Sequence, residues 1–447
     1  MEDQKVLIIA DFNQRTANGI TIRSFFKTWP RTKIAVCDWS GSIENSYVEE
    51  ITDYYILGKT EVCFIWPISL ISKVNESSKF RKDNLLRAKS KTNSDVNLTY
   101  SRSRRTFINL LQYTGLSQVR KKVKLSTELR NWIYDYKPDI VYSSFSTIYE
   151  MNLLLKLKKE IPVPFIIHFF DDVQKSIKSI NIINYFWSSR IKKKILNLIN
   201  GNVLCLTVSP KMEHEFTNRY RKSFYNLFYP IDPELFKKNA LSFSSKEFNT
   251  SKKKLEFTFV YTGKIDSDTI RPIKVFIKAI EDINKYKHYN INFKIYSQYH
   301  LNAWIEGIGE KVVKYFHGKA EFSRIPEVLS QADALLLPLD DRPKSVSYTK
   351  LSMSTKAPEY MISNRPIFLL APKILAVSEY LLSNECAFHS DINSSIKTNI
   401  IKFIENSKIR SQIAENAYYM ALKHHTIESV GSRLRTLINN HLSNSYK

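Results

Sequence analysis

Glycine is scarce in this chain, which has 10 glycines among its 447 residues. A dinucleotide-binding fingerprint requires three spaced glycines directly after the first strand of the domain. The loop 11–19, which follows the apolar run Val6–Ala10, contains only Gly19. A nicotinamide-cofactor enzyme is therefore a poor interpretation of this sequence.

Cysteine is equally sparse, and the four copies form no CxxC pair. All of them lie in apolar runs that are typical of buried strands: Cys37, Cys63, Cys205 and Cys386. The pattern predicts reduced core residues of a cytoplasmic protein, and it argues against a disulfide framework or a zinc site.

Long hydrophobic runs are also missing. No uncharged apolar stretch reaches the roughly 20 residues that a membrane-spanning helix needs. The run Val6–Ala10 is too short for the apolar region of a secretory signal. We therefore expect a cytoplasmic protein that is soluble or peripheral to a membrane.

The sequence does contain enough apolar residues for two domains, because 43% of its 447 residues are hydrophobic and a single core seldom grows that large. Strand-like and helix-like segments alternate in both halves, which predicts an α/β fold with two doubly wound domains. The predicted strands are 6–10, 34–37, 139–143, 165–168, 203–208, 257–261, 293–296, 312–315, 334–337 and 367–370. The predicted helices include 20–28, 148–159, 181–199 and 426–442.

The most informative stretch is 332–366, where an apolar run leads into a polar loop and then a helix start. Ala334–Pro338 is typical of a strand buried on both faces. Backbone N–H groups at the following helix start attract phosphate, and Lys356 adds a positive charge there. Glu359 lies one turn further in, where a carboxylate can accept two ribose hydroxyls. This arrangement indicates a site for a phosphorylated nucleoside.

Five sequence blocks occur in the order seen in one known family. They are KPDIVYSS at 137–144, VPFIIHFFDD at 163–172, LTVSPKMEHEF at 206–216, FVYTGKI at 259–265 and STKAPEYMISNRPI at 354–367. Together they resemble the retaining glycosyltransferases of GT-B fold, which use nucleotide sugars to build bacterial cell-surface polysaccharides. The resemblance spans nearly the whole chain.

The resemblance implies that the chain is divided into two domains, a linker and a C-terminal helix. Residues 1–236 would form an acceptor-side Rossmann-like domain and 255–425 a nucleotide-sugar-binding one, facing each other across a cleft. The polar stretch 237–254 would link them, and 426–447 would form a helix that crosses back to the first domain. No cofactor besides the nucleotide sugar is implied.

Donor-binding residues follow from the same resemblance. Ser354, Thr355, Lys356 and Glu359 match the family's donor block, and the resemblance implies that Glu359 would also act at the reaction centre. At the loop after the first strand of the second domain, a basic pair would hold the diphosphate while Gly263 lets the backbone approach phosphate: Lys264 and Arg271. Many relatives carry a glutamate eight positions before Glu359, but Leu351 stands there in this chain.

On the acceptor side, the resemblance implicates His168, Asp171, Asp172 and Gly19. His168 would lie near the reacting sugar, although a histidine at a strand end is as often a structural residue. Asp171 or Asp172 would bind the acceptor or orient His168, or else cap the next helix.

A DxD sequence at 266–268 is the kind of motif that binds a divalent metal in a different glycosyltransferase fold. Two acids match such a motif by chance often, and the GT-B pattern expects cations in this loop. We therefore predict that the activity requires no metal.

Positive charge is concentrated in the first half, although the net charge of +24 belongs to the whole chain. Residues 73–130 hold fifteen Lys or Arg against four acids, and 175–194 hold six against none. Such a face predicts contact with an anionic membrane surface, at the inner face of the cytoplasmic membrane. The apolar stripe of the helix 180–199 is better explained by packing on a sheet than by insertion into a bilayer.

Two alternatives stay open at this level. A nucleotide-sugar epimerase of the same fold would need no acceptor. A nucleic-acid-binding protein would also explain the basic charge, but the sequence has no zinc-finger spacing and no aromatic RNA-binding motif.

Overall fold

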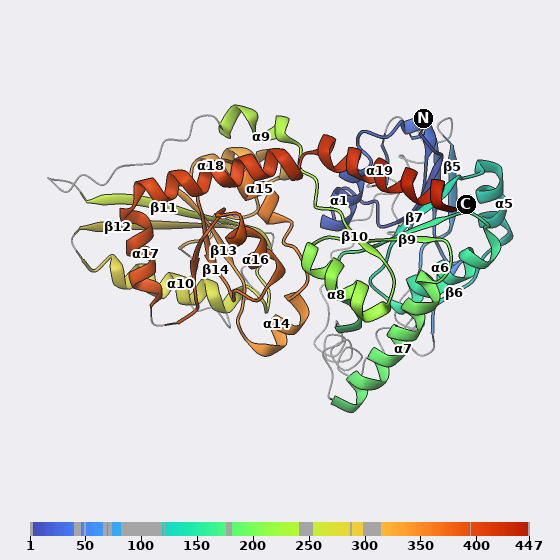
Figure 1. Cartoon of the computed structure of the whole chain (residues 1–447), viewed down its shortest axis with the longest axis horizontal. Helices are drawn as coiled ribbons and strands as arrows, with labels where there is room; N and C mark the ends of the chain where they lie inside the picture. Colours follow the sequence, from blue (N-terminus) through green and yellow to red (C-terminus); the bar gives the residue numbers. More distant parts are fainter. Residues whose placement is uncertain are drawn as a thin grey trace. The chain divides into compact units, whose positions relative to one another are not determined.

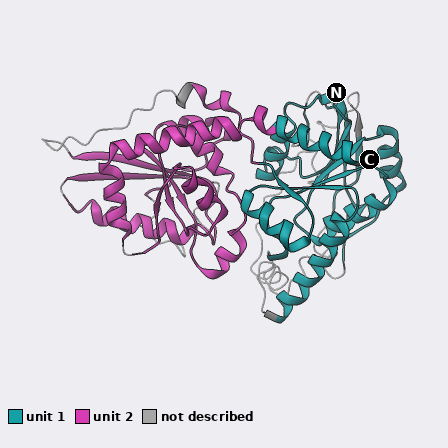
Figure 2. Cartoon of the chain, in the orientation of Figure 1, with its two compact units in different colours: residues 1–227, 431–447 teal, residues 228–430 magenta. Residues whose placement is uncertain are grey.

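The computed structural model contains two compact units (Figures 1 and 2). Unit 1 comprises Met1–Leu227 and Gly431–Lys447, and unit 2 comprises Phe228–Val430. The structure describes residues 3–39, 46–48, 51–65, 69, 74–81, 119, 121–175, 181–240, 254–286, 288–297, 314–393 and 395–445. Most of the basic stretch 73–130 and most of the predicted linker 237–254 therefore lie outside the described residues.

Unit 1 is built on an eight-stranded sheet in the order β10-β9-β8-β7-β1-β2-β3-β5. The strands are parallel except at one edge, where β5 runs antiparallel to β3. All residues of β1, β2, β7, β8 and β9 are buried, as expected for parallel strands covered on both faces. The bounds are β1 Val6–Ala10, β2 Ile34–Asp38, β3 Asp53–Ile56, β5 Ser78–Arg81, β7 Ile140–Ser144, β8 Phe165–Phe169, β9 Val203–Thr207 and β10 Phe224–Asn226.

A second, two-stranded sheet in unit 1 pairs β4 (Val62–Phe64) with β6 (Lys121–Val123). The helices of this unit are α1 Ala17–Phe25, α5 Thr127–Tyr136, α6 Ile148–Glu160, α7 Asn181–Ile199 and α8 Pro210–Tyr220, with short 3-10 turns at Arg31–Lys33 and Val173–Lys175. Local capping sets several of the helix starts. Thr147 and Glu150 form a capping box at the start of α6, which satisfies backbone N–H groups that the helix itself leaves unpaired.

Unit 2 is built on a five-stranded parallel sheet in the order β12-β11-β13-β14-β15. Its strands are β11 Leu255–Thr262, β12 Tyr289–Tyr296, β13 Ala334–Pro338, β14 Ile367–Leu370 and β15 Phe388–Ser390. Its helices are α9 Pro233–Ala240, α10 Ile270–Ile283, α13 Ile325–Ser330, α14 Pro343–Thr349, α15 Lys356–Ile362, α16 Ala376–Ser383, α17 Ile396–Glu405 and α18 Ser407–His424, with a 3-10 turn at Phe322–Arg324. The last helix, α19 (Ile427–Ser445), begins in unit 2 and continues into unit 1.

Alternating residues of β11 form the centre of the unit 2 core. Phe257, Phe259 and Tyr261 point to one face of the sheet, because successive side chains of a strand point to opposite faces. Phe276 of α10 and Phe403 of α17 pack against Phe259 with ring centroids 5.0 and 6.1 Å away. The helices α10 and α17 therefore cover this face.

Strand order places a topological switch point in each sheet. In unit 1, the chain leaves β1 for β2 on one side and later returns to β7 on the other. In unit 2, β12 and β13 flank β11 in the same way. Ligands of open parallel sheets bind outside the carboxyl ends of the strands at such points. We therefore expect ligand contacts at the residues that follow β1 and β11.

The predicted strands and helices are confirmed with two exceptions, and the predicted burial of one cysteine is wrong. The helix predicted at 20–28 is α1, which begins earlier because Thr16 caps it by accepting a hydrogen bond from the Gly19 N–H. In the predicted strand 312–315, the first two residues lie outside the described part, Tyr315 lies in a turn, and the next residue, Phe316, makes only an isolated bridge with Ile295. Cys63 is exposed on β4, whereas the sequence predicted a buried cysteine.

The helix α7 packs on the sheet of unit 1, as its apolar stripe predicted. Trp187, Ile191, Ile195 and Leu198 are all buried. The predicted stripe also included Ile183, which is half-buried, and Ile180, which lies outside the described residues. Among the described helices, none has the length and hydropathy that crossing a bilayer requires.

The segments by which the chain enters and leaves unit 2 are bound to each other within that unit. The Ile231 N–H donates to the His425 carbonyl at 2.6 Å, and the Ile427 N–H donates to the Ile231 carbonyl at 3.1 Å. The buried His425 ring contacts the Tyr380 hydroxyl through Nε2 at 2.9 Å and the Tyr229 carbonyl through Nδ1 at 3.1 Å. Burial lowers the pKa of His425 to about 4.

The lowered pKa predicts how stability changes with pH. Because an unfolded histidine has a pKa of about 6.5, the unfolded chain binds more protons between about pH 6.5 and pH 4. The free energy of unfolding should therefore fall as pH drops through this window. His425→Gln should reduce the slope by up to about 1.4 kcal/mol per pH unit. Chemical denaturation at several pH values measures the difference, and equal slopes for both proteins would contradict the assignment.

Candidate functional site

The start of α15 is held against the carboxyl end of β11 by Tyr360. Its buried hydroxyl accepts a hydrogen bond from the Thr262 N–H at 3.0 Å and also contacts the Thr262 hydroxyl at 3.4 Å. The two residues lie 98 positions apart in the sequence. This contact brings the polar residues of α15 to the switch point of the sheet.

Gly263 lies directly under the Lys356 side chain. It has a φ of +136°, a conformation that L side chains rarely adopt, and a Cβ atom here would overlap the end of Lys356. The Lys356 ammonium lies 5.6 Å from the centre of the Tyr261 ring. The absence of a side chain at Gly263 therefore allows a cation from α15 to lie across the end of β11.

Glu359 lies in the same helix, one turn after Lys356. Its side chain is half-buried, and within the described part of the chain its carboxylate has no hydrogen bond. Burial raises the pKa of Glu359 to about 7, and the nearby positive charge of Lys356 opposes the shift. A partly buried carboxylate that lacks a hydrogen-bond partner is typical of binding sites rather than of structural contacts.

The other residues of the predicted donor block occupy less buried positions. Ser354 is half-buried, and its hydroxyl accepts from the Lys356 N–H at 3.3 Å. Thr355 is exposed and precedes the helix without a side-chain cap. Leu351, where relatives carry a glutamate, is buried, so the position belongs to the apolar core in this chain.

Lys264 follows Gly263 and has a largely exposed side chain. Its ammonium lies 3.8 Å from a carboxylate oxygen of Asp266, and its carbonyl accepts from the Tyr261 hydroxyl at 2.6 Å. An exposed ion pair at this distance is weak. Lys264 therefore directly follows the glycine over which the Lys356 side chain lies.

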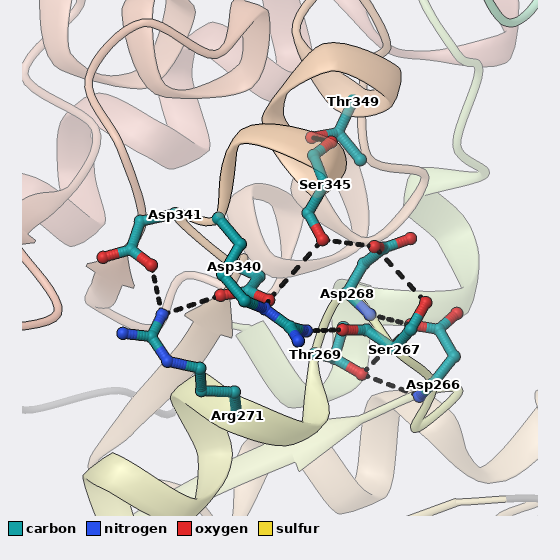
Figure 3. A network of polar contacts seen from close by, with 10 residues as sticks. Asp266, Ser267, Asp268, Thr269, Arg271, Asp340, Asp341, Ser345 and Thr349 are labelled. Atoms are coloured by element: carbon teal, nitrogen blue, oxygen red, sulfur yellow. Dashed lines mark hydrogen bonds and ion pairs between the residues drawn. The ribbon is translucent and has the colours of Figure 1, made fainter. Parts of the chain in front are cut away.

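Arg271, predicted to pair with Lys264, is bound instead to acids that follow β13. Figure 3 shows its guanidinium directed toward Asp340 and Asp341. The Asp340 contact is 2.8 Å long, and the Asp340 carboxylate is buried and also accepts from Arg342. Two carboxylates offset the charge of Arg271 in this structure, so its role at a diphosphate stays a prediction.

The DxD residues belong to the same network. The Ser345 hydroxyl donates to Asp268 at 2.7 Å, and an Asp266 carboxylate oxygen accepts from the Asp268 N–H at 3.0 Å (Figure 3). The Asp266 N–H in turn donates to the Thr269 hydroxyl at 3.0 Å. The Ser345 contact joins α14 to the loop after β11, and the other two contacts lie within that loop. Within the described ranges, no group of three or more residues of metal-binding type is found.

On unit 1, His168 is a fully buried residue of β8. Its Nδ1 contacts the Tyr142 hydroxyl at 2.9 Å, and the rings of Phe25 and Phe170 lie 4.9 and 4.7 Å from its own. Burial lowers the pKa of His168 to about 3, so the ring is neutral at pH 7. The Tyr142 contact is consistent with a structural role, and the predicted position of His168 beside a reacting sugar stays a prediction.

The other predicted acceptor-side residues differ in accessibility. Asp172 is buried, and both of its oxygens accept from Arg219 of α8 at 2.8 and 2.9 Å, so it serves as a structural ion pair. Asp171 is half-buried. Gly19 lies in the first turn of α1, where a Cβ atom would overlap the backbone of Asn13. The tight loop after β1 therefore requires glycine, and an acceptor-binding role of Gly19 or Asp171 stays a prediction.

Several residues of this region were not identified from the sequence. Tyr360 lies inside the quoted donor block, but nothing in the sequence indicates its contact with Thr262. At the carboxyl end of β12, the rings of Tyr296 and His317 stack with centroids 5.5 Å apart. An aromatic pair next to a switch point offers a flat surface for another ring.

The fold resembles solved structures over its whole length. A sucrose-phosphate synthase from Thermosynechococcus elongatus matches with a TM-score of 0.60 and 11% identity, covering 99% of this chain and 100% of its own. Anabaena HepE in complex with UDP and glucose matches with a TM-score of 0.59 and 10% identity, covering 98% and 100%. A structure of trehalose-6-phosphate from E. coli bound with UDP-2-fluoro glucose matches with a TM-score of 0.56 and 9% identity, covering 97% and 98%. No family model matches the sequence, and no curated protein does.

The likeness at full coverage shows that this chain has the GT-B fold, with one Rossmann-like sheet in each unit. The predicted fold class is confirmed. Because the identities are 9% to 11%, the structural likeness establishes the fold alone.

The raised pKa of Glu359 predicts a cost in stability. An unfolded glutamate ionises near pH 4.3, so the folded protein loses stability as pH rises from there to about 7. Glu359→Gln should therefore raise the melting temperature more at pH 8 than at pH 4.5. Thermal unfolding at both pH values tests this, with the exposed Glu415→Gln as a control. An equal effect at both pH values would show that Glu359 is ordinarily solvated.

Proposed function

We propose that this protein is a glycosyltransferase that moves a sugar from a nucleotide-diphosphate sugar to a glycan or lipid-linked acceptor, with retention of configuration. The observation that carries the proposal is the position of Lys356 across Gly263 at the switch point of the unit 2 sheet. Glu359 lies one turn away, and its carboxylate has no hydrogen bond among the described residues. These residues supply a cation and a carboxylate at neighbouring positions, as a nucleoside diphosphate requires.

The role proposed for each of these residues follows from the charge that develops during the reaction. Departure of the nucleoside diphosphate leaves negative charge on its phosphate oxygens, and fixed cations stabilise that charge best where water is excluded. Lys356, which lies over Gly263, and the more exposed Lys264, which follows it in the sequence, provide such cations. Glu359 would accept hydrogen bonds from the ribose hydroxyls. The carboxylates around Arg271 limit its part in this step.

The donor class is supported by the solved structures of similar fold. Those of HepE contain UDP with glucose or UDP-glucose, and the E. coli structure contains UDP-2-fluoro glucose. We therefore propose a UDP-sugar as the donor. The exposed side of the stacked pair Tyr296 and His317 is a surface of the right kind for a nucleobase ring. A metal-free reaction stays part of the proposal.

We further propose a place in surface polysaccharide synthesis, at the inner face of the cytoplasmic membrane. Three apolar side chains near the start of α7 are largely exposed: Ile182 at 83%, Tyr185 at 79% and Phe186 at 56%. Exposed Arg190, Lys192 and Lys193 follow on the same helix. Aromatic and aliphatic side chains next to cations are characteristic of helices that contact the membrane interface.

Ligand-dependent unfolding tests the donor site. UDP, GDP, ADP, CMP and their sugars are added to the wild type, Glu359→Ala and the exposed control Glu415→Ala. A ligand at 100 times its dissociation constant stabilises by about 2.7 kcal/mol. We expect UDP and a UDP-sugar to stabilise the wild type and the control. Glu359→Ala should weaken binding about 10- to 150-fold, the range for hydrogen bonds to a charged group.

Three results would contradict the proposal. No stabilisation by any nucleotide would remove the donor site. Stabilisation that Glu359→Ala leaves unchanged would place the nucleotide elsewhere. Conversion of a UDP-sugar without any acceptor would instead indicate an epimerase of the same fold.

A further inference from the structure

Glu359 differs from two other acids of unit 2 in how its negative charge is stabilised. The Asp340 carboxylate accepts from Arg271 at 2.8 Å, and the Asp268 carboxylate accepts from Ser345 at 2.7 Å. Glu359 is half-buried, and among the described residues its carboxylate accepts from no donor. Partial burial without hydrogen bonds disfavours the ionised form of a carboxyl group. The free site therefore favours a proton on Glu359.

One cation opposes this effect without cancelling it. Lys356 lies one helical turn before Glu359 and acts on it through its charge, without a hydrogen bond. The Lys356 ammonium lies instead over Gly263, 5.6 Å from the centre of the Tyr261 ring. Because the attraction between charges weakens with distance, burial is the larger effect. Burial raises the pKa of Glu359 to about 7, and Lys356 limits the shift.

Within the described chain, the elements that pack against α15 add no further charge at Glu359. These elements are β13, α9 and α18. β13 (Ala334–Pro338) has no titratable residue. Arg410 of α18 is buried and donates to the Phe403 carbonyl at 3.0 Å. The other charged or titratable side chains that do not act on the Glu359 carboxylate are Glu234, Lys237 and Lys238 on α9, and Lys408, Glu415, Tyr418, Tyr419, Lys423 and His424 on α18.

A ribose bound at Glu359 would reverse the preference for the proton. Each ribose hydroxyl can donate a hydrogen bond to a carboxylate oxygen, and hydrogen bonds to the ionised form stabilise that form. A protonated carboxyl group offers less acceptor capacity to the same two hydroxyls. The free and the bound site therefore differ in the protonation state that they favour.

We propose that binding of the nucleotide-sugar donor to unit 2 releases a proton from Glu359. The placement of the ribose at Glu359 rests on the proposed function. Because linkage between two ligands is reciprocal, a proton that donor binding expels must itself weaken donor binding. Donor affinity is therefore greatest when Glu359 is already ionised, and it falls as the medium becomes more acidic.

The size of the effect follows from the fraction of free protein that is ionised. With the pKa of Glu359 at about 7, that fraction is about nine-tenths at pH 8.0 and about 3% at pH 5.5. An apparent dissociation constant rises in inverse proportion to the fraction of protein that is competent to bind. The donor should therefore bind up to about 30-fold more weakly at pH 5.5 than at pH 8.0.

Calorimetric titration of the full-length protein with UDP-glucose tests the coupling. UDP-glucose is a better probe than UDP, because a terminal phosphate takes up a proton near pH 6. Titrations at pH 5.5, 6.5 and 8.0 give the affinities. The titration at pH 6.5 is repeated in Mes and in Bis-Tris, two buffers that differ in ionisation enthalpy, and the difference in heat gives the protons released. We expect release of about 0.8 proton per bound molecule at pH 6.5.

Two variants identify the titrating group. Glu359→Gln resembles the protonated acid in shape but can neither bind nor release this proton. Its affinity for UDP-glucose should be equal at pH 5.5 and pH 8.0 and should match that of the wild type at pH 5.5. The exposed control Glu415→Gln should keep the pH dependence of the wild type. Melting temperatures at each pH show that both variants remain folded.

Three outcomes would overturn the coupling. If the wild type binds UDP-glucose with equal affinity at all three pH values, while Glu359→Ala loses the binding, the coupling alone is wrong and the proposed function stands. If Glu359→Gln keeps the pH dependence, the proton comes from another group, such as His317 beside Tyr296. If no pH gives saturable binding, both the coupling and the proposed donor are wrong.

Discussion

The hydrogen bond between Tyr360 and Thr262 is the contact on which the candidate site depends. It connects the start of α15 to the carboxyl end of β11, two segments that the sequence separates by 98 positions. Through this contact, Lys356 lies over Gly263, and Glu359 is held close to the same strand end. Because Tyr360 is buried and its hydroxyl contacts both the N–H and the hydroxyl of Thr262, the geometry is fixed before any ligand binds. Preorganised charge of this kind is what an electrostatically catalysed reaction needs.

Charge is arranged differently at two neighbouring places in unit 2. Around Arg271, cations and carboxylates neutralise each other and join the loops that follow β11 and β13. Around Glu359, a carboxylate is left without a hydrogen bond among the described residues, at the expense of stability near neutral pH. In the first arrangement the charges compensate each other, and in the second a carboxylate is left available for binding. This contrast is the physical reason for proposing Lys356 and Glu359 as donor-binding residues ahead of Arg271.

The strands of both sheets were predictable because buried parallel strands form continuous apolar runs, as in Val6–Ala10 and Ala334–Pro338. Lys356 and Glu359 were identified because their block lies within a short stretch of sequence. The pairing of Arg271 with Asp340 was not predictable, since it requires knowledge that β13 lies next to β11. The burial of His168 depends likewise on Phe25 and Tyr142, which come from other elements. The helices and strands were thus predictable from local sequence. Which charged side chains remain available to a ligand depends instead on contacts between elements that are distant in the sequence.

The position of a bound nucleotide tests the central claim most directly. A crystal structure of the protein with UDP would locate the diphosphate by its electron density. The account predicts phosphate oxygens within hydrogen-bond distance of the Lys356 ammonium and the backbone at Gly263, with the ribose hydroxyls on Glu359. A nucleotide bound elsewhere on unit 2, or a diphosphate held by Arg271 after release of Asp340 and Asp341, would contradict it.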